Sequence, residues 1–396
     1  MASNVSAQSI KNGLKQNTML LALIFVMVFF QILLVITNKG SLFAPANISN
    51  LISQNAYVVV LATGMLLCIL TGGNIDLSVG SVVALVGALA GTLIVTVKLP
   101  LLLSIVLCLL AGLAIGAWQG FWIAYIRIPP FIVTLAGMLL WRGVALLILN
   151  GLTISPFPQN YLQFFTSFLP NTADAGLIAL VTRIIGIVLC IVLIVQQSLD
   201  RVRKTKKQYA IEPFFIFVLR IVLICFAMLA VSFLLARHKG IPVVLILIAV
   251  VVAAYSYYTS KTVPGRYLYV LGGNEKAAKM SGVDTNKMLF FAYANMGFLA
   301  GVAALMCVAR FNSASPSAGT NYEMDAIASC FIGGASAYGG IGTVGGAVIG
   351  AVFMGVLNNG MSILGIDANW QRAVKGIVLL AAVVFDVVSK KRKQAS

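Results

Sequence analysis

Long apolar runs without charge constrain the fold of this chain more than any other feature. The run 241–258, for example, contains no charged residue. The hydrocarbon core of a bilayer is about 30 Å thick, and a helix needs about 20 apolar residues to cross it. The composition agrees, because 60% of the chain is hydrophobic and only 9% is charged, against roughly 25% charged residues in soluble domains. A soluble enzyme and a disordered chain are excluded, and a polytopic membrane protein is indicated.

The apolar runs predict an all-α polytopic membrane protein with about 10–12 transmembrane helices. Strands of a membrane barrel would alternate polar and apolar residues, and alternation in these runs is weak. The apolar segments are 19–37, 55–71, 79–97, 101–126, 131–149, 174–196, 214–235, 241–258, 288–309, 323–341, 344–364 and 372–388. Because several segments are short or rich in glycine, ten full spans with additional broken or re-entrant pieces is an equally good interpretation.

The positions of Lys and Arg predict that both termini lie inside the cell. Cytoplasmic loops of membrane proteins are enriched in these residues. An N-in, C-in topology places Arg127, the run 201–207, the loop 261–287 and the tail 390–393 inside. The same rule explains the net charge of +17 without nucleic acid as a partner. We expect a cytoplasmic N-terminus at 1–18, a transmembrane domain at 19–388 with a basic linker at 197–213 and a cytoplasmic loop at 259–287, and a cytoplasmic tail at 389–396.

Residue patterns for catalysis, metal binding or cofactor binding are missing from the sequence. All six cysteines lie inside apolar runs, and His238 is the only histidine. The motifs G-x-x-x-x-G-K-[ST], H-E-x-x-H and G-x-S-x-G do not occur, so this chain does not bind ATP phosphates through the first of them. We therefore expect no catalytic residue, no metal site and no cofactor.

Glycines spaced four residues apart predict close helix packing. Gly112, Gly116 and Gly120 form one such ladder, and Gly297 and Gly301 form another. Small residues at this spacing allow the backbones of membrane helices to approach one another. The ladders are typical of a tightly packed bundle or of a dimer interface.

The segment 72–80 interrupts an apolar stretch. Its two glycines weaken a helix, and Asp76 or Ser78 can cap a new helix that begins near Val79. A broken helix at membrane depth must line a cavity or be buried in protein. We interpret the segment as part of a pathway wall, whereas Asp76 itself is slightly better explained by a short turn at the membrane surface.

Two hydrophilic loops are candidates for binding a partner. In the loop 259–287, Asn274 can cap a short helix that Gly282 can end. Adjacent alanines of that helix offer a face to another protein, and a helix that rests on lipid is an equal alternative.

The outer loop 310–325 carries Tyr322 and acidic residues that could receive a partner or a polar solute. The residues of this outer loop are explained at least as well by a solvated loop in which Glu323 or Asp325 lies near Arg310.

Three motifs resemble the membrane permease subunits of bacterial ABC sugar importers in the branched-chain amino-acid/ribose/xylose permease superfamily. Residues 74–81, Asn-Ile-Asp-Leu-Ser-Val-Gly-Ser, are similar to the family pattern G-x-I-D-L-S-V-G-S. Residues 130–138, Pro-Phe-Ile-Val-Thr-Leu-Ala-Gly-Met, are similar to P-S-F-I-V-T-L-x-x-M. Residues 265–282 resemble the degenerate A-A-x-x-x-G coupling helix of the family, although Lys276 separates Glu275 from Ala277.

The resemblance implies the permease subunit of an ATP-driven monosaccharide importer in the bacterial cytoplasmic (inner) membrane. Its implied partners are a separate ABC ATPase subunit, a periplasmic or lipid-anchored sugar-binding protein, a second permease copy in a homodimer, and membrane lipid. The length and the basic insert near 197–213 look most like the xylose-type permeases. Xylose is therefore the expected sugar, and another pentose or a hexose remains an alternative.

The resemblance also assigns expected roles to individual residues. The expected coupling helix contains Asn274, Glu275, Ala277, Ala278, Ser281 and Gly282. The expected pathway residues are Asn74, Asp76, Ser78, Asn295, Ser336 and Tyr338.

Two other functions compete with the importer. An ion-coupled secondary sugar transporter would need acidic residues buried in mid-membrane, and the acids near spans (Asp76, Glu323, Asp325 and Asp386) are expected at span ends. A non-transporting membrane scaffold or receptor subunit would neither move solute nor respond to an ATPase.

Overall fold

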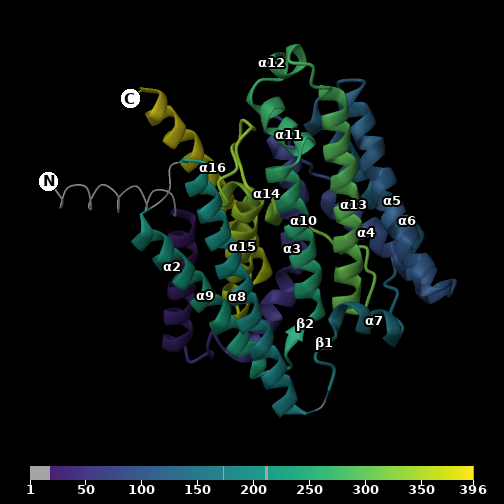
Figure 1. Ribbon diagram of the computed structural model, residues 1–396. Helices are drawn as coiled ribbons and strands as arrows, with labels where there is room; N and C mark the ends of the chain where they lie inside the picture. The colour runs from purple at the N-terminus through teal and green to yellow at the C-terminus, as the bar shows by residue number, and fades with distance from the viewer. Residues whose placement is uncertain (1–17, 173, 210–212, 396) are drawn as a thin grey trace.

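The computed structural model describes residues 18–172, 174–209 and 213–395, and almost all of their regular structure is helical (Figure 1). The long helices are α2 (Thr18–Ile36), α3 (Pro45–Leu70), α4 (Val79–Gly91), α5 (Leu101–Ala124), α6 (Pro130–Leu149), α8 (Ala175–Lys206), α9 (Phe214–Ala236), α10 (Val243–Lys261), α13 (Thr285–Phe311), α15 (Val344–Ile363) and α16 (Ala368–Ala395). The short elements are η1 (Thr92–Thr96), α7 (Gln159–Thr166), α11 (Val263–Gly273), α12 (Glu275–Met280), α14 (Tyr322–Ile332) and the antiparallel strands β1 (Phe168–Leu169) and β2 (Ile241–Pro242). The predicted all-α polytopic class is confirmed.

Among the described residues, ten helices are long and apolar enough to cross a membrane. The predicted spans 323–341 and 372–388 are not among them. Helix α14 stops at Ile332. Several glycines with positive φ follow it, and glycine adopts this backbone conformation readily because it has no Cβ. Helix α16 carries Arg372, Lys375 and Asp386 in its apolar stretch. By length and composition alone, ten full spans with additional pieces fit the described helices better than twelve.

The two ends of the bundle differ in the loops that they carry. Helix α12 and the C-terminal end of α16 lie at one end in Figure 1, and α7 with the strand pair lies at the other. The predicted topology requires this separation, because it puts 259–287 and the tail on one side and 150–174 on the other. Under the predicted topology the first is the cytoplasmic end and the second is the outer end, and we use these names as labels for the two ends.

The segments predicted to flank the spans are partly helical. Helix α8 continues to Lys206, well into the predicted basic linker 197–213, because basic side chains stabilise the last turn of a helix. Residues 210–212 of that linker, and 1–17 of the predicted N-terminus, lie outside the described residues. The predicted tail at 389–396 begins within α16, which ends at Ala395.

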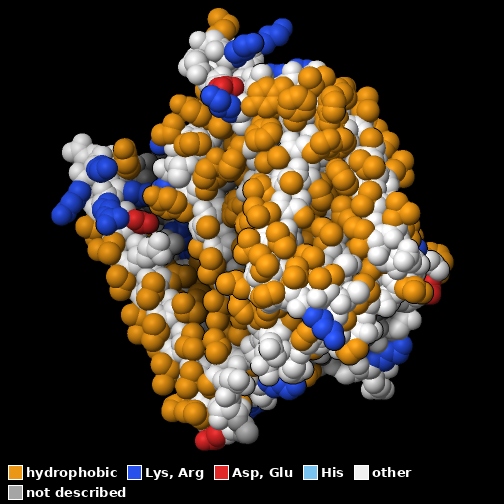
Figure 2. Space-filling view, turned by 90° about the vertical axis from the view of Figure 1, so that its right-hand side faces the viewer, with side chains coloured by type: hydrophobic (Ala, Val, Ile, Leu, Met, Phe, Trp, Pro, Cys, Tyr) orange, Lys and Arg blue, Asp and Glu red, His pale blue; other side chains and the backbone are white. Residues whose placement is uncertain are grey.

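The interior of the bundle is built from α3, α4, α13 and α15, whose side chains are mostly buried. The glycine ladder of α5 packs directly on the ladder of α13. A Cβ on Gly112 would lie 2.6 Å from the carbonyl oxygen of Gly297 and 3.2 Å from the Cα of Gly301. These two ladders therefore pack inside the bundle. Figure 2 shows apolar side chains over the middle of one face, with the visible Lys and Arg mainly toward its upper and lower ends.

Candidate functional site

The first break in the bundle lies between α3 and α4. Gly72 and Gly73 both have positive φ, at 130° and 76°. A Cβ on Gly73 would overlap the carbonyl oxygen of Ala337. The turn therefore needs glycine at this position both for its backbone conformation and for the close approach of the second break.

Asp76 is buried in this break, with 2% of its surface exposed. Its Oδ1 accepts hydrogen bonds from the Ser78 backbone N–H at 2.8 Å and from the Ser78 hydroxyl at 2.6 Å. Gln119 of α5 donates to that hydroxyl at 2.7 Å. The prediction that α4 begins near Val79 is confirmed. Asp76 lies in a short turn between two helices that are each long enough to cross a membrane, but its side chain is buried in that turn and not exposed. Gln119 stands in no motif and is 41 residues from Ser78, so the sequence did not indicate this contact.

The second break lies between α14 and α15. Ser336 is buried, whereas 65% of Tyr338 is exposed. The Ser336 backbone N–H donates to the Ile341 carbonyl at 2.9 Å, and the Gly340 N–H donates to the Leu70 carbonyl at 3.1 Å. The second bond joins the two breaks, so the segment that carries Asn74, Asp76 and Ser78 is in contact with the segment that carries Ser336 and Tyr338.

Asn295, the sixth predicted pathway residue, lies on α13. Its Oδ1 accepts a hydrogen bond from the Tyr255 hydroxyl of α10. The side chain therefore faces α10, and the pairing could not be read from the sequence because neither residue stands in a motif.

The cytoplasmic loop forms the short helix that its sequence predicts. The Asn274 side chain accepts from the Ala277 N–H at 3.1 Å, and Gly282 has φ +84° at the far end. Ala277 is exposed, but Ala278 is fully buried within its own chain. The predicted face of two alanines is therefore wrong for Ala278. Met280, with 89% of its surface exposed, is an apolar residue of this helix that the sequence had not indicated.

Helix α11 packs directly on both breaks. A Cβ on Gly272 would overlap the carbonyl oxygen of Leu70, and Gly340 of the second break is its next neighbour. The Tyr269 hydroxyl donates to the Gly342 carbonyl at 3.0 Å. The loop that carries α12 is thus in contact with the two broken segments.

The acidic residues of α14 are buried, with 9% of Glu323 and 1% of Asp325 exposed. The Lys375 ammonium of α16 lies 2.9 Å from Asp325 Oδ1. The Tyr57 hydroxyl donates to Asp325 Oδ2 at 3.0 Å. The solvated loop with Arg310 as partner is wrong, because both acids are buried and Asp325 is paired with Lys375 of α16. Both acids do lie at the start of a helix, in the first turn of α14.

A cavity of 340 Å³ lies at the outer end of the bundle. Small-molecule sites occupy roughly 300–1,000 Å³. Tyr57 and Tyr322 stack at its wall with ring centroids 3.8 Å apart. The polar lining residues are Asn50, Ser53, Gln54, Thr166, His238, Lys239 and Arg310. Burial, together with the neighbouring Lys239, lowers the pKa of His238, so a neutral imidazole faces this region at neutral pH.

The cavity could hardly be predicted from the sequence, because α3, α7, β1, β2, α10, α13, α14 and the turn before β2 all contribute to its lining. Of the lining residues, only Arg310, Phe311 and Tyr322 belong to the loop that the sequence indicated as a possible solute contact. Among the described residues, no group of three His, Cys, Asp or Glu could hold a metal ion, and the six cysteines are free thiols.

A family model described as the permease component of the branched-chain amino acid transport system matches residues 47–383. The chain belongs to this family. The permease is 38% identical over 374 residues to the xylose transport system permease protein of Escherichia coli strain K12, covering 94% of this chain and 92% of that protein. The protein of that name from Haemophilus influenzae is 37% identical over 94% of this chain and 96% of its own. No solved structure matches significantly.

The ribose import permease protein of Escherichia coli strain K12 is 34% identical over 355 residues, which is 90% of each chain. Membership of a permease family agrees with the resemblance found in the motifs. The permease is thus a multi-pass transport subunit and not an enzyme.

Proposed function

We propose that the permease forms the membrane pathway of an ATP-driven ABC importer for a monosaccharide, with xylose as the expected sugar. The observation that carries the proposal is identity of 38% to a xylose permease over 94% of this chain and 92% of that one. Identity to the ribose permease is 34% over 90% of each chain. This order favours xylose over ribose.

The two breaks and the outer cavity are the parts of the fold suited to pass a sugar. Broken helices at membrane depth line cavities or are buried in protein, and paired broken helices are common at transporter sites. Asn74, Asp76, Ser78, Ser336 and Tyr338 belong to the region where the breaks meet, and Asn295 lies on the neighbouring α13. The outer cavity offers stacked tyrosines and polar groups to a neutral polyhydroxylated solute.

Helix α12 is the contact for an ABC ATPase subunit in this proposal. Its exposed residues include Glu275, Ala277 and Met280, and Asn274, Ser281 and Gly282 shape its ends. A periplasmic or lipid-anchored sugar-binding protein delivers the sugar to the outer end. A second permease copy completes the pathway in the cytoplasmic membrane, with lipid around it. In this scheme 1–18 and 389–396 are cytoplasmic and 19–388 form the membrane domain.

Ion-coupled secondary transport is a second candidate because the structure buries acids that the sequence placed at span ends. Acidic residues inside a membrane protein mark ion or proton pathways in many transporters. Two of these acids have partners, since Asp76 accepts from Ser78 and Asp325 is paired with Lys375. The arrangement favours structural roles for both.

The test is uptake of labelled xylose into proteoliposomes that contain the permease, its ATPase and its binding protein. We expect uptake that requires ATP hydrolysis and the binding protein, and weaker uptake of ribose. Uptake that ignores ATP and follows a proton or sodium gradient would overturn the proposal in favour of the second candidate. No movement of any sugar would indicate a scaffold or receptor subunit.

The role of α12 is tested by adding a charge to its exposed face. We expect Ala277→Arg and Met280→Arg to abolish ATPase binding and uptake, because both side chains are exposed. Thr205→Arg is the matched control, since it adds the same charge to an exposed residue of α8 near the cytoplasmic end. Equal loss in all three variants would contradict a specific role for α12.

A further inference from the structure

Arg127 lies in the short turn that joins α5 to α6 at the cytoplasmic end. Its backbone has φ +64°, in a region that residues with a Cβ rarely adopt. The Ile128 N–H donates to the Trp122 carbonyl at 3.1 Å, which holds the turn against the last turn of α5. The position of the Arg127 side chain is therefore tied to the end of α5.

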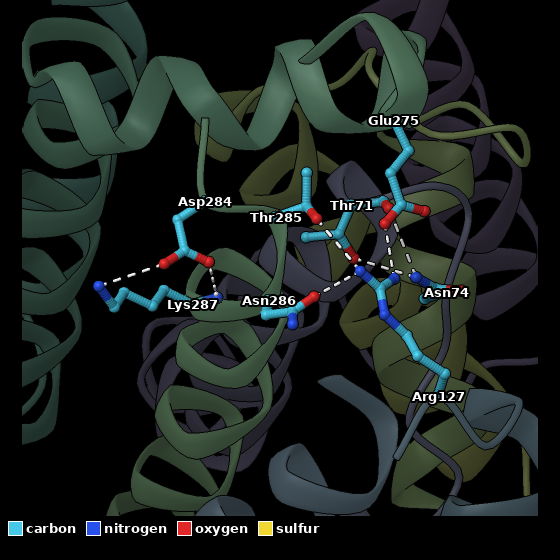
Figure 3. A network of polar contacts seen from close by, with 8 residues as sticks. All are labelled: Thr71, Asn74, Arg127, Glu275, Asp284, Thr285, Asn286 and Lys287. Carbon is cyan, nitrogen blue, oxygen red and sulfur yellow. Dashed lines mark hydrogen bonds and ion pairs between the residues drawn. The ribbon is translucent and has the colours of Figure 1, made fainter. Parts of the chain in front are cut away.

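The guanidinium of Arg127 contacts two other elements at once, as Figure 3 shows. Its Nη1 forms an ion pair with Glu275, the first residue of α12. Its Nη2 donates to the Thr285 hydroxyl at 3.1 Å and to the Asn286 side-chain oxygen. One planar group thus joins the α5–α6 turn to the start of α12 and to the first turn of α13, a geometry that the fork of arginine donors suits and a lysine would not.

Helix α5 leads from this contact to the first break. Gln119 lies five residues before the end of α5 and donates to the Ser78 hydroxyl, which in turn donates to Asp76. The glycine ladder holds α5 tightly on α13. A contiguous set of contacts therefore runs from Glu275 through Arg127 and α5 to the buried carboxylate of the break.

We propose that Arg127 is a positioning residue that passes movements of α12 to the α5–α6 turn and thence to the Asp76–Ser78–Gln119 contacts of the first break. The proposal rests on the importer function, in which an ATPase moves α12. Arg127 touches neither sugar nor nucleotide in this scheme, and its role is to keep α12, α5 and α13 moving together.

The ion pair is poorly placed to act as a stabiliser of the fold. The side chains of Arg127 and Glu275 are 42% and 46% exposed, and exposed ion pairs contribute little to stability. Loss of Arg127 should therefore leave a folded permease in which α12 and α5 move independently. The Asp284–Lys287 pair is the control, because it is also an exposed contact, with 51% and 73% of its side chains exposed, and at 3.2 Å it stays within the start of α13.

The first experiment measures xylose uptake and ATP hydrolysis together in proteoliposomes with the ATPase and the binding protein. Arg127→Ala should lower the sugar transported per ATP hydrolysed several-fold while hydrolysis continues, because α12 can then move without the α5–α6 turn. Arg127→Lys should restore part of the ratio, since it keeps the charge opposite Glu275 but loses the fork. Lys287→Ala should leave the ratio unchanged.

An unchanged ratio in Arg127→Ala, or an equal fall in Arg127→Ala and Lys287→Ala, would overturn the proposal. If the parent shows no ATP-dependent uptake, the importer function fails, and a second measurement tests Arg127 by itself. Spin labels at Met280→Cys and Tyr125→Cys report the distance between α12 and the α5–α6 turn in the permease reconstituted without an ATPase, so that the label on α12 displaces no partner. Arg127→Ala should broaden this distance distribution and Lys287→Ala should not; a width that does not change in Arg127→Ala would refute the positioning role.

Discussion

Helices α13 and α8 are both long and apolar, yet they occupy opposite environments. Each helix contains an apolar window of 18 residues. In α13, 83% of that window is buried, whereas in α8 only 17% is buried, although α8 is the more hydrophobic of the two. Lipid tails are as apolar as leucine, so hydrophobicity does not separate inside from outside within a membrane. The comparison shows that residue size, and not hydropathy, distinguishes the interior helix from the peripheral one.

The two helices differ in their small residues. Helix α13 presents Gly297 to α5 at backbone contact, whereas α8 exposes about half of Ile187 and Ile191. Helix α8 packs on α9 where Gly186 lies against Ser232, whose hydroxyl donates to the Thr182 carbonyl at 2.8 Å. Close backbone approach is thus concentrated in the region that leads to the breaks, and the α8–α9 pair is attached at the periphery.

The largest effect is expected where the α5–α13 contact is broken. In Gly116→Leu the new Cβ would overlap the Tyr293 carbonyl oxygen, and neither backbone can yield, so we expect a loss at or above the roughly 3 kcal/mol upper end of ordinary overpacking. Gly143→Leu is the control, since a Cβ there meets nothing within 4 Å. Thermal unfolding in detergent measures both. Equal melting temperatures would show that the ladder is not a tight contact.

A somewhat smaller loss is expected from the buried ion pair of the interior. Lys375→Met leaves Asp325 without its counter-charge, and removing one partner of a buried pair costs about 3–5 kcal/mol. We expect the lower end, near 3 kcal/mol, because 18% of the Lys375 side chain is exposed. The double variant Lys375→Met with Asp325→Asn should recover part of the loss in the same unfolding assay. A double variant that is no more stable than Lys375→Met alone would contradict a stabilising ion pair between Lys375 and Asp325.

The third prediction tests whether the exposed face of α8 lies in lipid. Ile191 is 54% exposed near the middle of α8, and a charge at the centre of a lipid-facing helix costs about 2.5–3.5 kcal/mol in membrane insertion. Ile191→Arg should therefore reduce the inserted, folded permease several-fold in membrane fractions. Leu199→Arg, near the cytoplasmic end, is the control, because its charge can reach the interface. Equal yields would place Ile191 outside the hydrocarbon region.

Local features of the site were predictable from the sequence, whereas contacts between distant segments were not. The cap at Asn274, the end at Gly282 and the start of α4 each depend on residues within one turn. The ion pair of Arg127 with Glu275 joins residues 148 apart, and Asp325 and Lys375 are 50 apart. No periodicity or motif connects such residues, because their meeting depends on how the whole bundle packs.

Burial was likewise harder to predict than helix formation. Neighbouring alanines in α12 look equivalent in the sequence, but the helix turns Ala278 inward and leaves Ala277 exposed. A short turn between two spans likewise suggests an exposed Asp76, but its side chain is buried. Hydrogen bonds from the Ser78 hydroxyl and backbone N–H compensate for this burial, and the packing that covers Asp76 is a property of the whole bundle.

The smallest effect is expected when the peripheral helix loses side-chain volume without gaining charge. In Ile191→Ala, lipid tails can fill the space, so we expect a change in stability below about 1 kcal/mol, against roughly 2–5 kcal/mol for a comparable truncation in a packed core. Leu305→Ala is the matched interior truncation, because only 2% of Leu305 on α13 is exposed. Both are measured by thermal unfolding in nanodiscs. A core-sized loss in Ile191→Ala would mean that protein, such as the second permease copy, covers this face of α8.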